Sequence, residues 1–145
     1  MRGRHREIPR NLCRVRSQRS VIDYALQRRA LLGEVATGRR SRTEVCDAHP
    51  YLRLAARHYG EPSGTRCPVC DGADHCLVHY VYGDALGTSA GQAKSSAELT
   101  LLAESSPEFR VYVVEVCLDC GWNHLARAFA LGHSDRSAHP AAAER

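Results

Sequence analysis

Apolar residues between Ser17 and Thr37 recur at the three- to four-residue spacing of a helix, and polar residues fall on the opposite side. The apolar positions are Val21, Ile22, Ala25, Leu26, Leu32, Val35 and Ala36. Arg29 projects near the middle of this stripe, so we expect its stem to lie along apolar surface, its guanidinium to meet an internal carboxylate, or the residue to face a partner. Gly38 is placed to end the helix.

Two further helices are predicted before residue 62. Ser41 and Glu44 match a capping box, which predicts a short helix through Cys46. Pro50 suits the first turn of another helix, whose apolar face ends before Gly60. That face consists of Tyr51, Leu52, Ala55, Ala56 and Tyr59. The short turn between the two helices invites comparison with a helix-turn-helix reader of DNA, but helix pairs joined by short turns are also common packing units.

The second half of the chain changes to an alternation of period two. This pattern predicts strands over 75–82 and 109–116, both rich in Val and Tyr. A third strand is expected over 122–131, where several alanines leave a helix as the alternative. Between the first two strands lie a loop rich in Gly and Ser, 83–94, and a helix that Ser95 begins with a second capping box.

Composition places the chain among globular proteins with one core. It has 145 residues, of which 43% are hydrophobic and 25% charged, and no stretch approaches the roughly 18 uninterrupted apolar residues of a membrane-spanning helix. The basic N-terminus is not followed by the apolar core of a signal peptide, so we expect a cytoplasmic protein without membrane contact. Thiols stay reduced in that compartment, and seven cysteines therefore indicate a metal rather than disulfides.

Two Cys-x-x-Cys pairs, Cys67 with Cys70 and Cys117 with Cys120, carry the chemistry of the sequence. Each pair can present two thiolates to one cation from a tight turn, and four thiolates complete a tetrahedron. Zn²⁺ fits such a site, while iron in the same cage, as in rubredoxin-type electron carriers, is the chemical competitor. His75, His79 and His124 are alternative ligands only if a pair is incomplete, and the remaining cysteines are interpreted as bystanders.

These elements predict an α+β fold in which N-terminal helices are followed by a zinc ribbon, a small antiparallel three-stranded sheet with a helical insertion. The expected divisions are a basic flexible tail over 1–16, a helical region over 17–62, a zinc-ribbon domain over 63–133 and a second flexible tail over 134–145. Each cysteine pair abuts a strand in this arrangement, and the helical insertion accounts for the unusually long separation of the pairs.

Charge divides the chain into two halves of opposite sign. Residues 1–66 carry fifteen basic and six acidic side chains, whereas residues 67–145 carry five and ten. Such asymmetry indicates a part that seeks phosphate or an acidic protein surface. The candidate residues for binding nucleic acid or a partner are Arg16, Arg19, Arg28, Arg29, Arg39, Arg40, Arg42, Arg53 and Arg57.

Motifs for catalysis are missing from the sequence. A nucleobase deaminase needs a His-x-Glu or Cys-x-Glu element before Pro-Cys-x-x-Cys, and the chain has none. A thioredoxin-like enzyme needs one Cys-x-x-Cys at a strand-to-helix junction, whereas both pairs here flank apparent antiparallel strands. The sequence also lacks a glycine-rich phosphate loop, a His-Glu-x-x-His motif and a nucleophile elbow, so we expect a protein that is not an enzyme.

The run from about Ser17 to Gly132 resembles an uncharacterised actinobacterial family, domain of unknown function 5318. The similar segments are 21–26, 44–48 with 50–52, 67–70 and 114–125. The resemblance implies a small intracellular zinc-ribbon protein and brings no known activity. Members of that family begin near Val15 or Ser17, which raises the hypothesis that Val15 marks the true initiation codon.

Taken together, the sequence favours a non-enzymatic zinc-ribbon accessory protein, a regulator that docks on a nucleic-acid machine of transcription or translation through its basic helical half. The alternative is an adaptor that binds another protein, with a purely structural zinc and solvated arginines. A rubredoxin-like redox carrier is the third possibility. Oligomeric state and the choice among DNA, RNA and protein are open at this stage.

Overall fold

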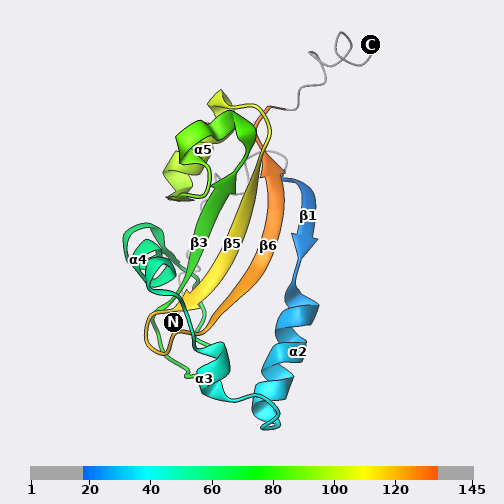
Figure 1. Cartoon of the computed structure of the whole chain (residues 1–145), viewed down its shortest axis with the longest axis vertical. Coiled ribbons are helices and arrows are strands. Elements are labelled where there is room, and N and C mark those ends of the chain that lie inside the picture. The colour runs from blue at the N-terminus through cyan, green and yellow to red at the C-terminus, as the bar shows by residue number, and fades with distance from the viewer. Residues whose placement is uncertain (1–17, 134–145) are drawn as a thin grey trace, which may run out of the picture.

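The computed structural model of the chain describes residues 18–133, and these build one antiparallel sheet with helices packed around it (Figure 1). The strands run in the order β1-β6-β5-β3-β2, and β4 pairs with β3 beside this path. Their bounds are β1 Arg19–Asp23, β2 Glu61–Pro62, β3 His75–Tyr82, β4 Ala93–Lys94, β5 Phe109–Cys117 and β6 Asn123–Leu131. The two predicted tails, 1–16 and 134–145, lie outside the described residues.

The predicted fold class is wrong. Instead of N-terminal helices followed by a small three-stranded ribbon, the described chain forms a six-stranded sheet to which the predicted helical part contributes β1 and β2. Val21 and Ile22 lie in β1, where Ile22 pairs with Ala128 of β6. The apolar spacing predicted a helix over these residues because a five-residue strand is too short to show its own period of two before the helix that follows it.

Helix α2 (Ala25–Ala36) begins only where the Asp23 carboxylate accepts the Ala25 N–H at 2.7 Å. It contains no fully buried residue, and the predicted apolar stripe is only partly covered, since Leu26 remains 72% exposed. Arg29 is exposed as well. The half-buried part of α2, Leu31, Leu32 and Val35, packs against the cysteine-bearing end of the sheet.

The other helices begin where their capping residues predict. Capping boxes start α3 (Arg42–Val45) at Ser41 and α5 (Ser96–Ser105) at Ser95, and Pro50 opens α4 (Pro50–Tyr59). A 3₁₀ segment, η1 (Asp84–Ser89), precedes β4. The three long strands were also predicted to within a residue or two of their observed bounds. No helix among residues 18–133 is long and apolar enough to cross a membrane.

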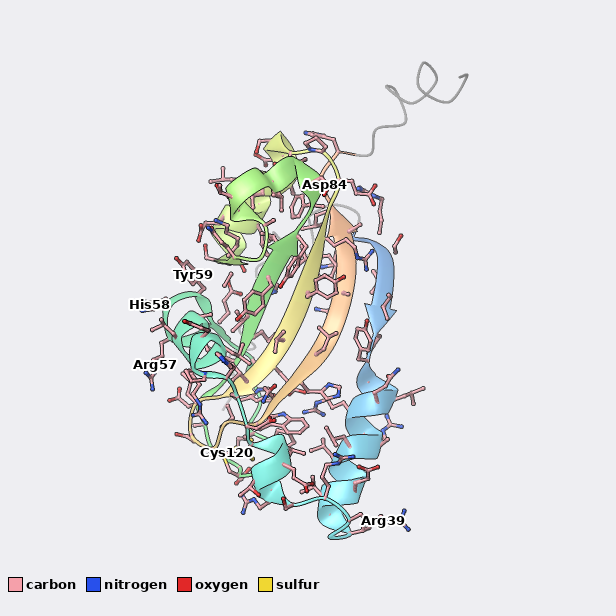
Figure 2. All side chains as sticks on the ribbon, in the orientation of Figure 1. Arg39, Arg57, His58, Tyr59, Asp84 and Cys120 are labelled. Carbon is pink, nitrogen blue, oxygen red and sulfur yellow. The ribbon has the colours of Figure 1, made fainter. Side chains whose placement is uncertain are left out.

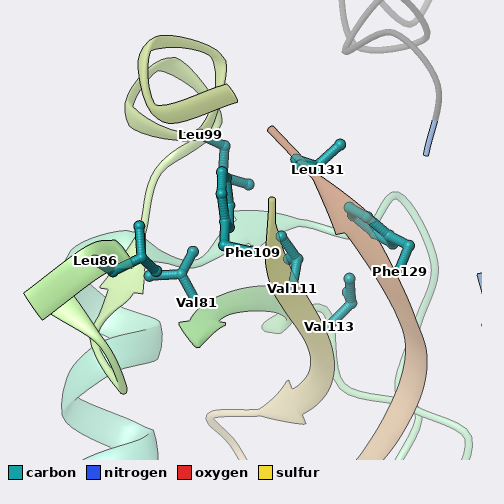
Figure 3. Packing of buried hydrophobic residues seen from close by; sticks show 8 residues of the cluster. All are labelled: Val81, Leu86, Leu99, Phe109, Val111, Val113, Phe129 and Leu131. Atoms are coloured by element: carbon teal, nitrogen blue, oxygen red, sulfur yellow. The ribbon is translucent and has the colours of Figure 1, made fainter. Parts of the chain in front are cut away.

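Two hydrophobic clusters cover different parts of the sheet. The larger lies between the long strands, η1 and α5 (Figure 3), and contains Val81, Leu86, Leu99, Phe109, Val111, Val113, Phe129 and Leu131. The second packs α4 against β3 through Ala56, Val78 and Val116. Burial of each large apolar side chain stabilises the fold by roughly 1.5–3 kcal/mol, so these clusters fix the register that positions the cysteines.

Candidate metal centre

The two cysteine pairs form turns with the same hydrogen-bond pattern. In the first, the Cys67 N–H donates to the Gly72 carbonyl and the Asp71 N–H donates back to Cys67, both at 3.0 Å. In the second, Cys117 and Trp122 repeat the first bond at 2.8 Å, and the Gly121 N–H donates to Cys117 at 2.8 Å. Each Cys-x-x-Cys therefore sits in a closed knuckle whose backbone holds both sulfurs on one side.

Backbone conformation after the second cysteine of each pair completes the knuckle. This residue is left-handed in both: Asp71 has φ 60° and Gly121 has φ 90°. At Gly121 a side chain is excluded, since an added Cβ would lie 2.2 Å from Nη2 of Arg53 and 2.9 Å from the Cys46 carbonyl. Gly72, one position later in the first knuckle, leaves room for the Asp119 carboxylate, which an added Cβ would approach to 2.3 Å.

Strand register brings the two knuckles together. β3 begins directly after the first knuckle and β5 runs into the second, and their pairing places His75 opposite Cys117. Although 46 residues separate Cys70 from Cys117, the knuckles thus lie side by side at one end of the sheet. The long connection between the strands leaves from the other end, where Tyr82 pairs with Arg110.

The four predicted cysteines converge, with all sulfurs within 4.8 Å of one another. The Sγ atoms of Cys67 and Cys120 are 3.7 Å apart, and those of Cys70 and Cys117 are 3.6 Å apart. A tetrahedral zinc with bonds of about 2.3 Å to sulfur has edges of about 3.8 Å, so the observed separations fit a single ion.

Backbone amides around the sulfurs favour thiolates. The Gly72 N–H lies 3.3 Å from Sγ of Cys70, and the Trp122 N–H lies 3.3 Å from Sγ of Cys120. Without a metal, burial raises the pKa of the Cys67 thiol to about 11 and also raises that of Cys117. A bound cation would replace the thiol protons and hold the four sulfurs as thiolates.

Cys46 is a fifth thiol at this centre, and the sequence interpretation treated it as a bystander. It ends α3, and its S–H donates to Sγ of Cys120 at 3.4 Å. No spacing rule could have found it, because it reaches the centre through the packing of α3 against the second knuckle. Cys76, the other described cysteine outside the four, is buried in β3 and donates to the Val116 carbonyl instead.

A buried carboxylate lies next to the metal centre. Glu115 of β5 is 3% exposed and is bound by Arg28 of α2, whose Nη2 donates at 3.2 Å, and by Nε2 of His75 at 2.7 Å. Nδ1 of the same imidazole and the Ser63 hydroxyl share a hydrogen bond of 2.5 Å. Burial opposes ionisation of Glu115, but its bonds to Arg28 and His75 hold the pKa of the carboxyl below its usual value.

The nine candidate arginines divide into two groups. The first group makes contacts within the chain. Besides Arg28, Arg19 donates to the Gly132 carbonyl, Arg42 to the Val69 carbonyl and Arg53 to the Ala48 carbonyl, and Arg40 forms an exposed ion pair with Glu34. Arg29, Arg39 and Arg57 are exposed, and their side chains make no hydrogen bond or ion pair within residues 18–133; Figure 2 labels Arg39 just beyond α2 and Arg57 on α4. Arg16 lies outside the described residues, and the role of all nine in binding stays a prediction.

The histidines weighed as substitute ligands lie elsewhere. His75 is engaged with Glu115 as described. His79 is half-buried, and this burial lowers the pKa of its imidazole. His124 stacks on Trp122 with ring centres 5.9 Å apart. Among the described residues, the cysteine cluster contains none of the three.

Comparison with known proteins gives relatives without an assigned activity. A profile described as a family of unknown function (DUF5318) matches residues 15–145. Uncharacterized proteins of Mycobacterium bovis and of two Mycobacterium tuberculosis strains are each 50% identical over 111 residues, which is 77% of this chain and 81% of the relative. No solved structure matches the chain significantly.

Proposed function

This chain belongs to the actinobacterial family of unknown function DUF5318, and we propose that it is a non-enzymatic protein built around one structural Zn²⁺. The ligands are Cys67, Cys70, Cys117 and Cys120. One observation carries the proposal: four sulfurs from two knuckles lie within 4.8 Å of one another, and two of their separations, 3.7 and 3.6 Å, match the edge of a tetrahedral zinc site.

A structural role for the ion follows from the closed ligand set. Four thiolates leave no coordination position for water or substrate, which distinguishes structural from catalytic zinc. Val45, Trp122 and the half-buried residues of α2 surround the cysteines, so the ion would fix one end of the sheet to two helices. Iron in the same four-sulfur site would make the protein a redox carrier. A redox role does not explain the exposed side chains of Arg29, Arg39 and Arg57.

Metal analysis of the purified chain tests this proposal. We expect one zinc per chain in a colourless preparation, and a coloured iron-loaded protein would replace it with the redox alternative. Cys67→Ser and Cys120→Ser should each lower zinc content and melting temperature, because structural zinc contributes folding free energy. Cys76→Ser is the matched control, since Cys76 is buried in β3 outside the cluster. Unchanged zinc content in both ligand variants would refute the assignment.

We further propose that the metal-stabilised fold acts as an accessory protein of a nucleic-acid machine. Support comes from Arg29, Arg39 and Arg57, which are exposed in the half of the chain that carries the positive charge. The test is binding of the zinc-loaded chain to labelled oligonucleotides across salt concentrations. A steep salt dependence that weakens in Arg29→Gln and Arg39→Gln supports the proposal. Capture of a protein partner, with no oligonucleotide bound at low salt, favours the adaptor instead.

A further inference from the structure

Five of the six tyrosines of the chain gather on one part of the surface. Tyr80 and Tyr82 lie on β3, Tyr112 lies on β5, and Tyr51 and Tyr59 come from the adjoining helix α4. Tyr82 is 46% exposed and Tyr51 is 77% exposed. Tyrosine rings combine a large apolar face with a polar hydroxyl and are enriched at interfaces, and we call this group of five the tyrosine surface.

Strand register explains why the three strand tyrosines share a face. Tyr80 is directly opposite Tyr112, and Tyr82 is opposite Arg110 in the same β3–β5 pairing. Cross-strand neighbours and residues two apart along a strand point to the same side of a sheet. The rings of Tyr82 and Tyr112 accordingly meet edge to face with centres 5.4 Å apart, and the Arg110 guanidinium lies 5.9 Å from the Tyr112 ring centre.

Two shallow hollows adjoin these rings. One, of about 500 Å³, is lined by Tyr80, Tyr82, Tyr112 and Val114. The other, of about 570 Å³, lies between α4 and the sheet and has Tyr80 in its wall together with Tyr51, Tyr59 and His58. Because Tyr80 lines both, the two hollows adjoin at its ring, and together we call them the track. Figure 2 labels Arg57, His58 and Tyr59 together at α4.

The chemistry of this track points to an anionic ligand with flat rings. No carboxylate is among the described residues that line either hollow, while Arg110 and His58 supply positive or protonatable groups. Tyrosine rings offer flat faces for stacking, and bases stack on them without regard to sequence. Arginine beside a ring adds attraction for phosphate and a planar group of its own.

We propose that the tyrosine surface binds single-stranded nucleic acid, with bases stacked on Tyr82 and Tyr112 and the backbone held by Arg110. This inference deepens the proposed function, on which it rests, by naming the contact surface and the kind of strand. A single strand is required because bases of a duplex are stacked on one another and cannot lie on a sheet face. The surface binds bases by stacking and phosphate by charge, and both groups are common to DNA and RNA.

Fluorescence anisotropy with the zinc-loaded full chain tests the surface. The probes are labelled oligothymidine and oligouridine, about ten nucleotides long, and a duplex of the same length. We expect Tyr82→Ala and Tyr112→Ala each to raise the Kd about five-fold or more, and Tyr82→Phe, which keeps the ring, to leave it unchanged. Arg110→Gln should lower the slope of log K against log salt by about one.

Leu101→Ala is the control, because Leu101 is an exposed apolar residue of α5 that lines neither hollow. The two single-stranded probes tell DNA from RNA. Salt-sensitive binding that ignores both tyrosine variants would overturn this surface and leave the proposed function standing. Binding of the duplex as tightly as the single strands would overturn it as well. If no probe binds at low salt, both the surface and the nucleic-acid role fail.

Discussion

The buried carboxylate of Glu115 gives the sharpest test of how the helical and sheet parts depend on each other. Arg28 reaches it from α2 across 87 positions of sequence, and His75 reaches it from β3. Arg28→Met removes the guanidinium and keeps an apolar stem of similar length. The carboxylate, which is 3% exposed in the parent protein, then keeps only the His75 imidazole of these two partners, and a buried charge loses its permanent cation.

The magnitude follows from burial on the two sides of the pair. Breaking a fully buried ion pair costs about 3–5 kcal/mol. The Arg28 side chain is 34% exposed, so solvent already screens part of the attraction, and we expect a loss nearer to about 2–3 kcal/mol. Arg29→Met is the matched control, since Arg29 is exposed in the same helix and its replacement should change stability by less than about 0.5 kcal/mol.

A second substitution separates a buried charge from lost packing. Glu115→Gln keeps the shape of the side chain and an oxygen that accepts from His75 Nε2. Added to Arg28→Met, it should restore about 1 kcal/mol or more, because the double variant no longer buries an uncompensated charge. Urea unfolding at saturating zinc measures the free energy of unfolding of the parent protein, Arg28→Met, Arg29→Met and the double variant. Zinc is held constant because bound metal itself shifts stability. A double variant less stable than Arg28→Met would refute the reasoning.

Three further changes have defined outcomes. Gly33→Ala should stabilise the chain by about 0.5–1 kcal/mol in urea unfolding, since Gly33 lies inside α2 and an added Cβ meets nothing within 4 Å. Burial lowers the pKa of His79 below 6.5, so the unfolded chain takes up a proton first and stability falls as pH drops below about 6.5. His79→Leu should flatten that part of the stability profile relative to the parent protein. Cys120→Ser should weaken zinc binding less than Cys67→Ser in a competition titration, because Cys46 can supply the fourth sulfur, and adding Cys46→Ser should remove that difference.

Features set by neighbouring residues were predictable from the sequence. The capping boxes at Ser41 and Ser95 start helices because each hydroxyl and the carboxylate three residues later satisfy backbone amides locally. The strand over His75–Tyr82 was predicted with its observed bounds, since its alternation records two different faces. The convergence of the four cysteines was predicted because each pair needs only its own turn and one shared cation.

Features that depend on distant partners were not predictable in the same way. Residues Arg19–Asp23 form a strand because β6 offers an edge to pair with, and nothing within the segment reveals that edge. Arg29 was expected to lie along apolar surface, meet an internal carboxylate or face a partner; it is exposed, and its neighbour Arg28 binds the carboxylate of Glu115 instead, a contact that depends on the distant strand β5. Cys46 joins the metal centre through packing of α3, which has no signature in cysteine spacing.

The sheet explains how two knuckles that are far apart in the sequence can share one site. The β3–β5 pairing is continuous from His75 and Cys117 at the metal end to Tyr82 and Arg110 at the other. The connecting segment leaves and returns at the far end, so its length has no bearing on the distance between sulfurs. Loop closure costs more free energy as a connection lengthens, but only logarithmically, and the pairing that closes this one is the same pairing that aligns the cysteines. The four cysteines at one end and the tyrosine surface further along the same two strands therefore depend on one register: a slip of one residue would separate the sulfurs and turn the tyrosines of the slipped strand to the opposite face.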